Sequence, residues 1–228
     1  MKRVHLWEQG LLGKVSSKVL RAAILALAAN ACLTSDGKPR AEGDEIFERV
    51  TERRQSQNTR ARRNNPHIYK YYSCGDLAHY CLEKIGCRDE TLVNRDSDGG
   101  KTPWIAGVNV SRISRHPAFM SAEGWHDPYQ PGDILIVYDP TKPNSEHVCI
   151  LVAIEVLSDG SKRFITYDYG QELENGLACG KRREVPFTVQ NDRIYLGNRV
   201  LIGWLNVDLV PLSEPAEVPD DFALGIAA

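Results

Sequence analysis

The chain has 228 residues, of which 42% are hydrophobic and 25% charged, enough for one globular domain with a core and a short appendage. Its 28 basic and 30 acidic residues leave a formal net charge of −2, which argues against a general nucleic-acid binder. No run approaches the roughly eighteen consecutive apolar residues of a membrane-spanning helix, so we expect no transmembrane segment. The six cysteines are too sparse for a disulfide scaffold and lack the C-x₂-C spacing of a zinc site. We therefore expect free thiols, no metal and no cofactor.

Residues 1–65 predict a helical extension. Apolar side chains recur there at the spacing of an amphipathic helix, at Leu12, Val15, Val19, Ala22, Ala23 and Leu27. A signal peptide is the alternative, because Ala29-Asn30-Ala31 resembles a small-residue cleavage site. Charged residues interrupt the segment, however, and we favour a packed helix. Residues 43–62 predict a second, highly charged helix, whose arginines are more typical of a solvated face than of a nucleic-acid patch.

The segment 73–86 predicts a third helix with a clear apolar stripe. Its members are Cys74, Leu77, Ala78, Cys81, Leu82 and Ile85. Ser73 is a suitable N-cap, and Gly86 suits the position after the last turn. Cys74 then lies in the first turn, where unpaired N–H groups and the helix dipole favour a thiolate. The alternative is that Cys74 is simply a small buried side chain at the end of the stripe.

Two further segments have few periodic features. Residues 87–130 are rich in Gly, Ser, Asp and Pro and predict an irregular insertion, held to the core by Trp104, Phe119 and Trp125. Long connections of this kind often line binding sites, so we expect the insertion to border the active site and govern substrate choice. Residues 211–228 predict a loosely attached, acidic, proline-containing tail.

Between these segments the pattern changes to strands. β-Branched or aromatic runs separated by turn residues occupy 133–138, 147–155, 163–169, 183–189 and 199–207. Ser158-Asp159-Gly160 between two of them predicts an antiparallel hairpin. Helices followed by a meander of strands predict an α+β fold.

A histidine and an aspartate on these strands favour the interpretation of Cys74 as a catalytic nucleophile. His147 opens a strongly apolar strand, and imidazole is suited to holding a thiol as thiolate and protonating a leaving amine. Asp168 on the next strand is placed to orient the imidazole, since adjacent strand ends lie about 4.8 Å apart. Gln171 is the reserve candidate for this third role. Asp168 is alternatively an ordinary strand-end residue.

Three motifs together resemble the NlpC-type branch of papain-like cysteine peptidases, including the related CHAP amidases. They are Ser73-Cys74-Gly75-Asp76-Leu77, Pro131-Gly132-Asp133-Ile134 and His147-Val148-Cys149-Ile150. The resemblance covers about residues 66–170. The sequence departs from the family at Ser73, where Asp is usual, at Gly75-Asp76, where Ser-Gly is common, and at Cys149, where Gly is customary.

The resemblance implies a papain-like NlpC-type catalytic domain over 66–210, with N-terminal helices packed on an antiparallel β-sheet. It implies that a Cys74–His147–Asp168 triad hydrolyses amide bonds in peptidoglycan stem peptides without a metal. Backbone N–H groups at the start of the Cys74 helix would then stabilise the oxyanion. Tyr72 is a substrate-contact candidate by analogy with the family. Trp104 and Trp125 either pack the insertion or stack on a sugar.

Two alternatives stay open at this point. The same Cys–His pair suits an acyltransferase, and a degenerate domain would serve as a non-catalytic binding module. A cell-wall substrate implies a secreted or periplasmic site of action, although no convincing cleaved signal peptide is present. If the protein is an exported toxin, a cognate inhibitor or immunity protein is an expected partner.

Overall fold

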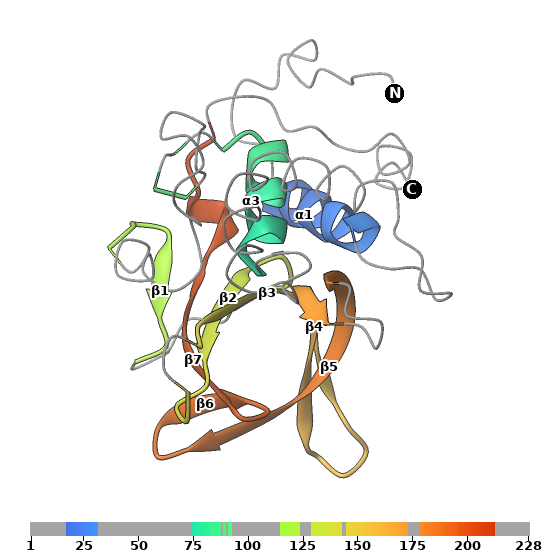
Figure 1. The fold of residues 1–228 in the computed structure, drawn as a ribbon, viewed down its shortest axis with the longest axis vertical. Coiled ribbons are helices and arrows are strands. Elements are labelled where there is room, and N and C mark those ends of the chain that lie inside the picture. The colour runs from blue at the N-terminus through green and yellow to red at the C-terminus, as the bar shows by residue number, and fades with distance from the viewer. Residues whose placement is uncertain are drawn as a thin grey trace, which may run out of the picture.

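A computed structural model describes residues 17–31, 74–87, 89, 91–92, 115–123, 129–142, 145–172 and 178–212. Its helices are α1 (Ser17–Ala31), α3 (Cys74–Lys84) and the 3₁₀ helix η4 (Val207–Leu209). Its strands are β1 (Phe119–Ser121), β2 (Ile134–Tyr138), β3 (His147–Val156), β4 (Lys162–Glu172), β5 (Ala178–Gln190), β6 (Arg193–Leu196) and β7 (Arg199–Leu205). Figure 1 shows the helices gathered on one side of the strands.

The strands form a closed antiparallel barrel. The sheet order is β1-β7-β2-β3-β4-β5-β6, and a further pairing of β7 with β6 closes six strands, β2 to β7, into a ring (Figure 1). The short strand β1 pairs with β7 outside the ring. The expected α+β, papain-like NlpC-type fold is therefore wrong, because strands dominate the described part and they close on themselves. Sequence patterning detects single strands but carries no direct information on closure.

Two strands were not anticipated, and one of them closes the barrel. β6 has only four residues and follows a tight turn at Asn191 and Asp192, both with positive φ (50° and 59°). Asn and Asp tolerate this conformation, which suits a two-residue hairpin turn. β1 lies inside the segment 87–130 that we expected to be irregular. The five predicted strands and the antiparallel hairpin at Ser158–Gly160 are confirmed, with boundaries shifted by a few residues.

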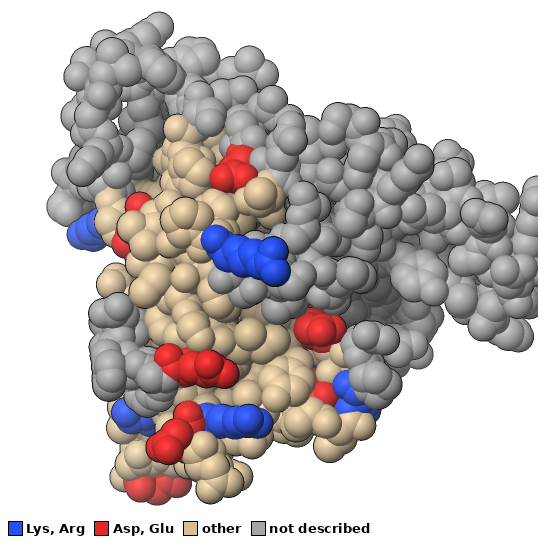
Figure 2. All heavy atoms as spheres, turned by 90° about the vertical axis from the view of Figure 1, so that its left-hand side faces the viewer, with Lys and Arg blue, Asp and Glu red and all other residues tan. Residues whose placement is uncertain are grey.

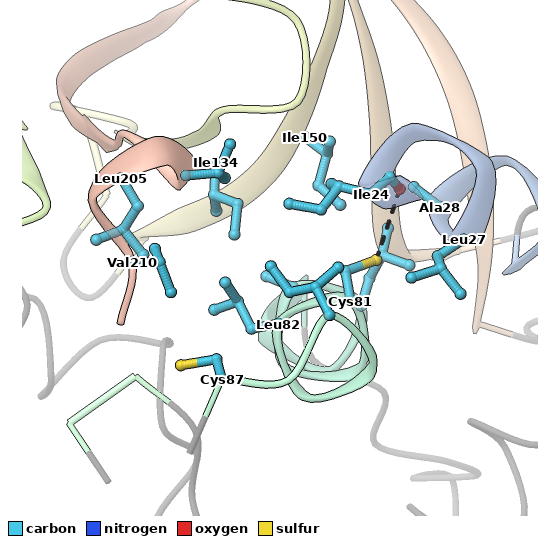
Figure 3. Close-up of a cluster of buried hydrophobic side chains, with 14 of the residues drawn as sticks. Ile24, Leu27, Ala28, Cys81, Leu82, Cys87, Ile134, Ile150, Leu205 and Val210 are labelled. Atoms are coloured by element: carbon cyan, nitrogen blue, oxygen red, sulfur yellow. Dashed lines mark hydrogen bonds between the residues drawn. The ribbon is translucent and has the colours of Figure 1, made fainter. Parts of the chain in front are cut away.

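Alternation along the strands divides the buried side chains into two clusters. On β3, Val148 and Ile150 face the helices, whereas Cys149 and Leu151 belong to the cluster inside the barrel. The interior is filled by large side chains such as Phe164 and Trp204, both almost fully buried. Figure 3 shows the outer cluster, where the Cys81 thiol donates to the Ile24 carbonyl at 4.0 Å.

Helix α3 follows the predicted pattern closely. Every residue of the predicted stripe after Cys74 is at most 1% exposed. The helix ends at Lys84, and Gly86, two residues further on, has a φ of 93° that turns the chain. The Gly86 N–H donates to Glu83 O and the Cys87 N–H to Leu82 O, both at 3.0 Å, which is the Schellman pattern. The capping role of Ser73 lies outside the described residues.

Helix α1 packs against the outer wall of the barrel, as expected of a packed helix. Its buried stripe differs in part from the predicted one and consists of Leu20, Ala23, Ile24, Leu27, Ala28 and Ala31, together with Arg21. The Arg21 guanidinium bonds Asp133 Oδ1 at 2.8 Å, Pro131 O at 2.9 Å and Asp208 Oδ2 at 2.9 Å. Arg21 thus ties α1 to the start of β2 and to η4.

The Pro131-Gly132-Asp133 motif, directly before β2, contacts Arg21 of α1. Gly132 has a φ of 92°, and a Cβ there would lie 3.2 Å from the Arg21 Cα, so the close approach requires glycine. The Asp133 carboxylate, 1% exposed, also accepts the backbone N–H of Gln130 at 2.7 Å and of Val207 at 3.3 Å. The Pro131-Gly132-Asp133 motif therefore has a structural role in this protein, because it holds α1 against the start of β2.

On the face shown in Figure 2, described Lys and Arg side chains are interspersed with Asp and Glu, with no patch of one sign. Of the helices in the described part, none combines the length and apolarity needed to cross a membrane. The predicted helix at 43–62, most of the 87–130 insertion and the tail beyond 212 lie outside the described residues.

Candidate active site

Cys74 is the first residue of α3, and its side chain is partly exposed. The other cysteines with described side chains, Cys81, Cys87 and Cys149, are all buried. The first N–H groups of a helix have no acceptor within it, so they and the helix dipole favour negative charge at this position. Among the described thiols, Cys74 is the one accessible to a substrate.

His147 lies beside Cys74 at the start of β3. Its ring is hydrogen-bonded to the Cys74 side chain on one side and to Asp168 on the other. The distance from His147 Nε2 to Asp168 Oδ1 is 2.5 Å. Since Nε2 faces the carboxylate, Nδ1 is the ring nitrogen left for the thiol. The residue is 8% exposed, so the ring meets solvent only at the edge of the site.

These contacts stabilise the charged form of the imidazole. Burial alone would lower the pKa of His147, but hydrogen bonds to Asp168 and Cys74 and the negative charge of both partners raise it to about 9. At neutral pH the ring is therefore an imidazolium, hydrogen-bonded to the buried Asp168 carboxylate. This is the charge state in which a thiolate is held ready to attack.

Asp168 is fixed from several directions. It is 2% exposed, and while Oδ1 faces His147, Oδ2 accepts the Thr166 hydroxyl. Arg183 Nη1 also lies 3.4 Å from Oδ1. Burial alone would raise the pKa of Asp168, yet the contacts with His147, Thr166 and Arg183 hold it below its usual range. The carboxylate therefore stays ionised and holds the imidazole in one orientation.

Cys149 lies behind the site as the direct cross-strand partner of Asp168. Burial raises the pKa of its thiol well above the usual range, and the nearby negative charges of Asp168 and Cys74 add to this effect. Cys149 is therefore a neutral thiol and a poor nucleophile.

A second histidine–aspartate pair is not suited to act as a base. His116 Nε2 bonds Asp89 Oδ2 at 3.0 Å, and its Nδ1 accepts the Ala118 N–H at 3.0 Å. Both ring nitrogens are thus occupied, so neither is available to a thiol. Of these two described histidine–aspartate pairs, the one with an imidazole that also contacts Cys74 is His147–Asp168.

The structure thus brings together Cys74, His147 and Asp168. Gln171 lies further along β4, where its side chain is not described. Tyr72, Trp104 and Trp125 lie outside the described residues. Thr166 and Arg183, which also contact Asp168, were not anticipated. For Thr166 the sequence offers one signal, the alternation of side chains along a strand, which puts it on the same face as Asp168. The sequence offers no such signal for Arg183.

No three His, Cys, Asp or Glu side chains within the described ranges are arranged to hold a metal ion. Comparison of the chain with family models, curated proteins and solved structures gives no match.

Proposed function

We propose that the protein is a cysteine hydrolase that cleaves amide bonds through Cys74, His147 and Asp168. The observation that carries this proposal is the continuous chain of contacts from a partly exposed thiol through His147 to a buried carboxylate. A structural cysteine needs neither a charged imidazole beside it nor a carboxylate that orients the ring. Nucleophilic catalysis by a thiol uses both.

The reaction would proceed in two steps. The Cys74 thiolate attacks the carbonyl carbon, and the His147 imidazolium gives its proton to the amine as the carbon–nitrogen bond breaks. This leaves a thioester on Cys74 and a neutral imidazole. His147 then takes a proton from water, whose oxygen attacks the thioester and releases the acid. First-turn N–H groups of α3 would stabilise the oxyanion of both tetrahedral intermediates.

The substrate class we propose is the peptide of peptidoglycan. It rests on the motif resemblance to NlpC-type peptidases, in which the order of Cys74, Pro131-Gly132-Asp133 and His147 is shared. Incubation of the full chain with purified peptidoglycan, followed by mass analysis of the soluble fragments, tests this directly. New peptide termini that need Cys74 support the proposal. Transfer of an acyl group to an added amine without hydrolysis would indicate an acyltransferase instead. If no product depends on Cys74, the domain would be a non-catalytic binding module.

Turnover should fall at alkaline pH as His147 loses its proton. The imidazolium donates to the leaving amine, so the rate of acylation should stay high below the pKa of about 9 and decline through it. Asp168→Asn removes the negative charge that helps to raise this pKa, so the alkaline limb should move toward neutral pH. The measurement is kcat/KM against pH for both proteins. An alkaline limb that does not move in Asp168→Asn would contradict the assignment of Asp168 as the orienting group.

A further inference from the structure

Next to the proposed triad, the inner face of β5 carries two cations. Lys181 is the cross-strand partner of Asp168, and Arg183 is the partner of Thr166. Directly opposed residues of antiparallel strands project to the same side of the sheet. Both cations therefore share the face of β4 that carries Asp168, and the contact of Arg183 with that carboxylate agrees with this placement.

These cations are incompletely paired. Asp168 already binds His147 and Thr166, and Arg183 reaches it only at 3.4 Å with a side chain that stays 41% exposed. Lys181 is partly buried and has no hydrogen-bond or ion-pair partner within the described part of the chain. Among the described residues, Asp168 is therefore the one recognised anionic partner of Arg183, and Lys181 has none.

On the outer face of β3, β4 and β5, the charged side chains are paired differently. Arg182, which alternates with Lys181 and Arg183, pairs with Glu184 at 2.8 Å. Arg163 pairs with Glu155 and with Glu184, both at 2.6 Å. Arg182 and Arg163 on the outer face therefore have acidic partners, whereas on the inner face Arg183 reaches only a carboxylate that His147 and Thr166 already use, and Lys181 has no partner among the described residues. A half-buried cation gains most from an anion that comes with a ligand.

We infer that Lys181 and Arg183 form an anion-binding subsite beside Cys74 that selects substrates with a carboxylate near the scissile amide. This inference rests on the proposed function and narrows its substrate class to acidic peptides. The planar guanidinium of Arg183 would bind the carboxylate through two N–H donors, and Lys181 would add a second charge. The same two cations would disfavour a basic side chain at that position.

Alkylation of Cys74 tests the subsite without any need for turnover. Iodoacetate and iodoacetamide react with the same thiolate, but only iodoacetate is an anion, so the ratio of the two rates reports positive charge at the site. Lys181→Gln and Arg183→Gln should each lower this ratio about threefold to tenfold, and the double variant more. Arg182→Gln, one residue away on the outer face, is the matched control and should change it less than about twofold. Peptide mapping by mass spectrometry assigns the label to Cys74. An unchanged ratio in the double variant would overturn the inference.

Two peptides of one sequence, with glutamate or glutamine beside the cleaved bond, extend the test to substrates. Wild-type kcat/KM should favour the glutamate peptide, and Lys181→Gln/Arg183→Gln should remove that preference. Cleavage without preference would overturn the subsite while the proposed hydrolase stands. If alkylation ratios follow the expectation but neither peptide nor peptidoglycan is cut, the subsite stands and the hydrolase proposal fails.

Discussion

Replacing Cys74 with alanine is expected to reduce amide hydrolysis by at least about a thousandfold, since it removes the nucleophile. The loss should appear in kcat, because substrate contacts outside the thiol are retained. Stability should change little, as the side chain is small, partly exposed and at the first position of α3. Hydrolysis assays and thermal unfolding of the same preparation measure both quantities. A fall in Tm of tens of degrees would mean that Cys74 is a core residue.

The same variant has a readout that is independent of substrate. The hydrogen bond and charge of Cys74 both help to raise the pKa of His147 to about 9, so that pKa should drop in Cys74→Ala. Titration of the His147 ring followed by NMR measures this. Cys87→Ala is the matched control, because Cys87 is a buried thiol just beyond the C-terminal end of α3. It should leave both turnover and the His147 titration unchanged while lowering stability.

The catalytic candidates were predictable because each depends on local pattern. Cys74 is identified by the stripe and end signals of one helix, and His147 by its position before an apolar strand. Asp168 required only that two consecutive strands pair as a hairpin, which Ser158–Gly160 indicates. Thr166 and Arg183 could not be assigned in this way. The contact of Arg183 with Asp168 depends on the register of β4 with β5, which no residue pattern specifies.

The barrel could not be predicted for a related reason. Its closure depends on β6, whose four residues are too few to show a periodic pattern. The turn residues Asn191 and Asp192 were the available signal, since adjacent residues that tolerate positive φ often mark a hairpin. Likewise, the role of Arg21 is not visible in the sequence, because a charged residue within an apolar stretch carries no sign of its distant partners Asp133 and Asp208. The structure instead makes it a buried link between α1 and the barrel.

That link makes Arg21→Met the substitution with the largest expected effect on stability. It would leave Asp133, which is 1% exposed, without its cationic partner. Removing one member of a buried ion pair costs roughly 3–5 kcal/mol of the free energy of unfolding. Denaturant unfolding at neutral pH measures the loss. Arg163→Met is the matched control, because its ion pairs with Glu155 and Glu184 lie on the solvent-exposed outer face of the barrel, where screening makes ion pairs weak, so its loss of stability should be much smaller.

The pH dependence of this loss identifies its cause. Burial already raises the pKa of Asp133 despite the opposing charge of Arg21, so Arg21→Met should raise it further. A carboxyl whose pKa is higher in the folded than in the unfolded state favours folding at low pH and loses that contribution as pH rises through the folded value. The difference between wild type and Arg21→Met should therefore shrink as pH falls toward 4, about the ordinary pKa of an aspartate. Adding Asp133→Asn should recover part of the loss at neutral pH, since no buried charge remains. A deficit that is independent of pH and unrelieved by Asp133→Asn would assign the effect to lost packing of the arginine stem instead.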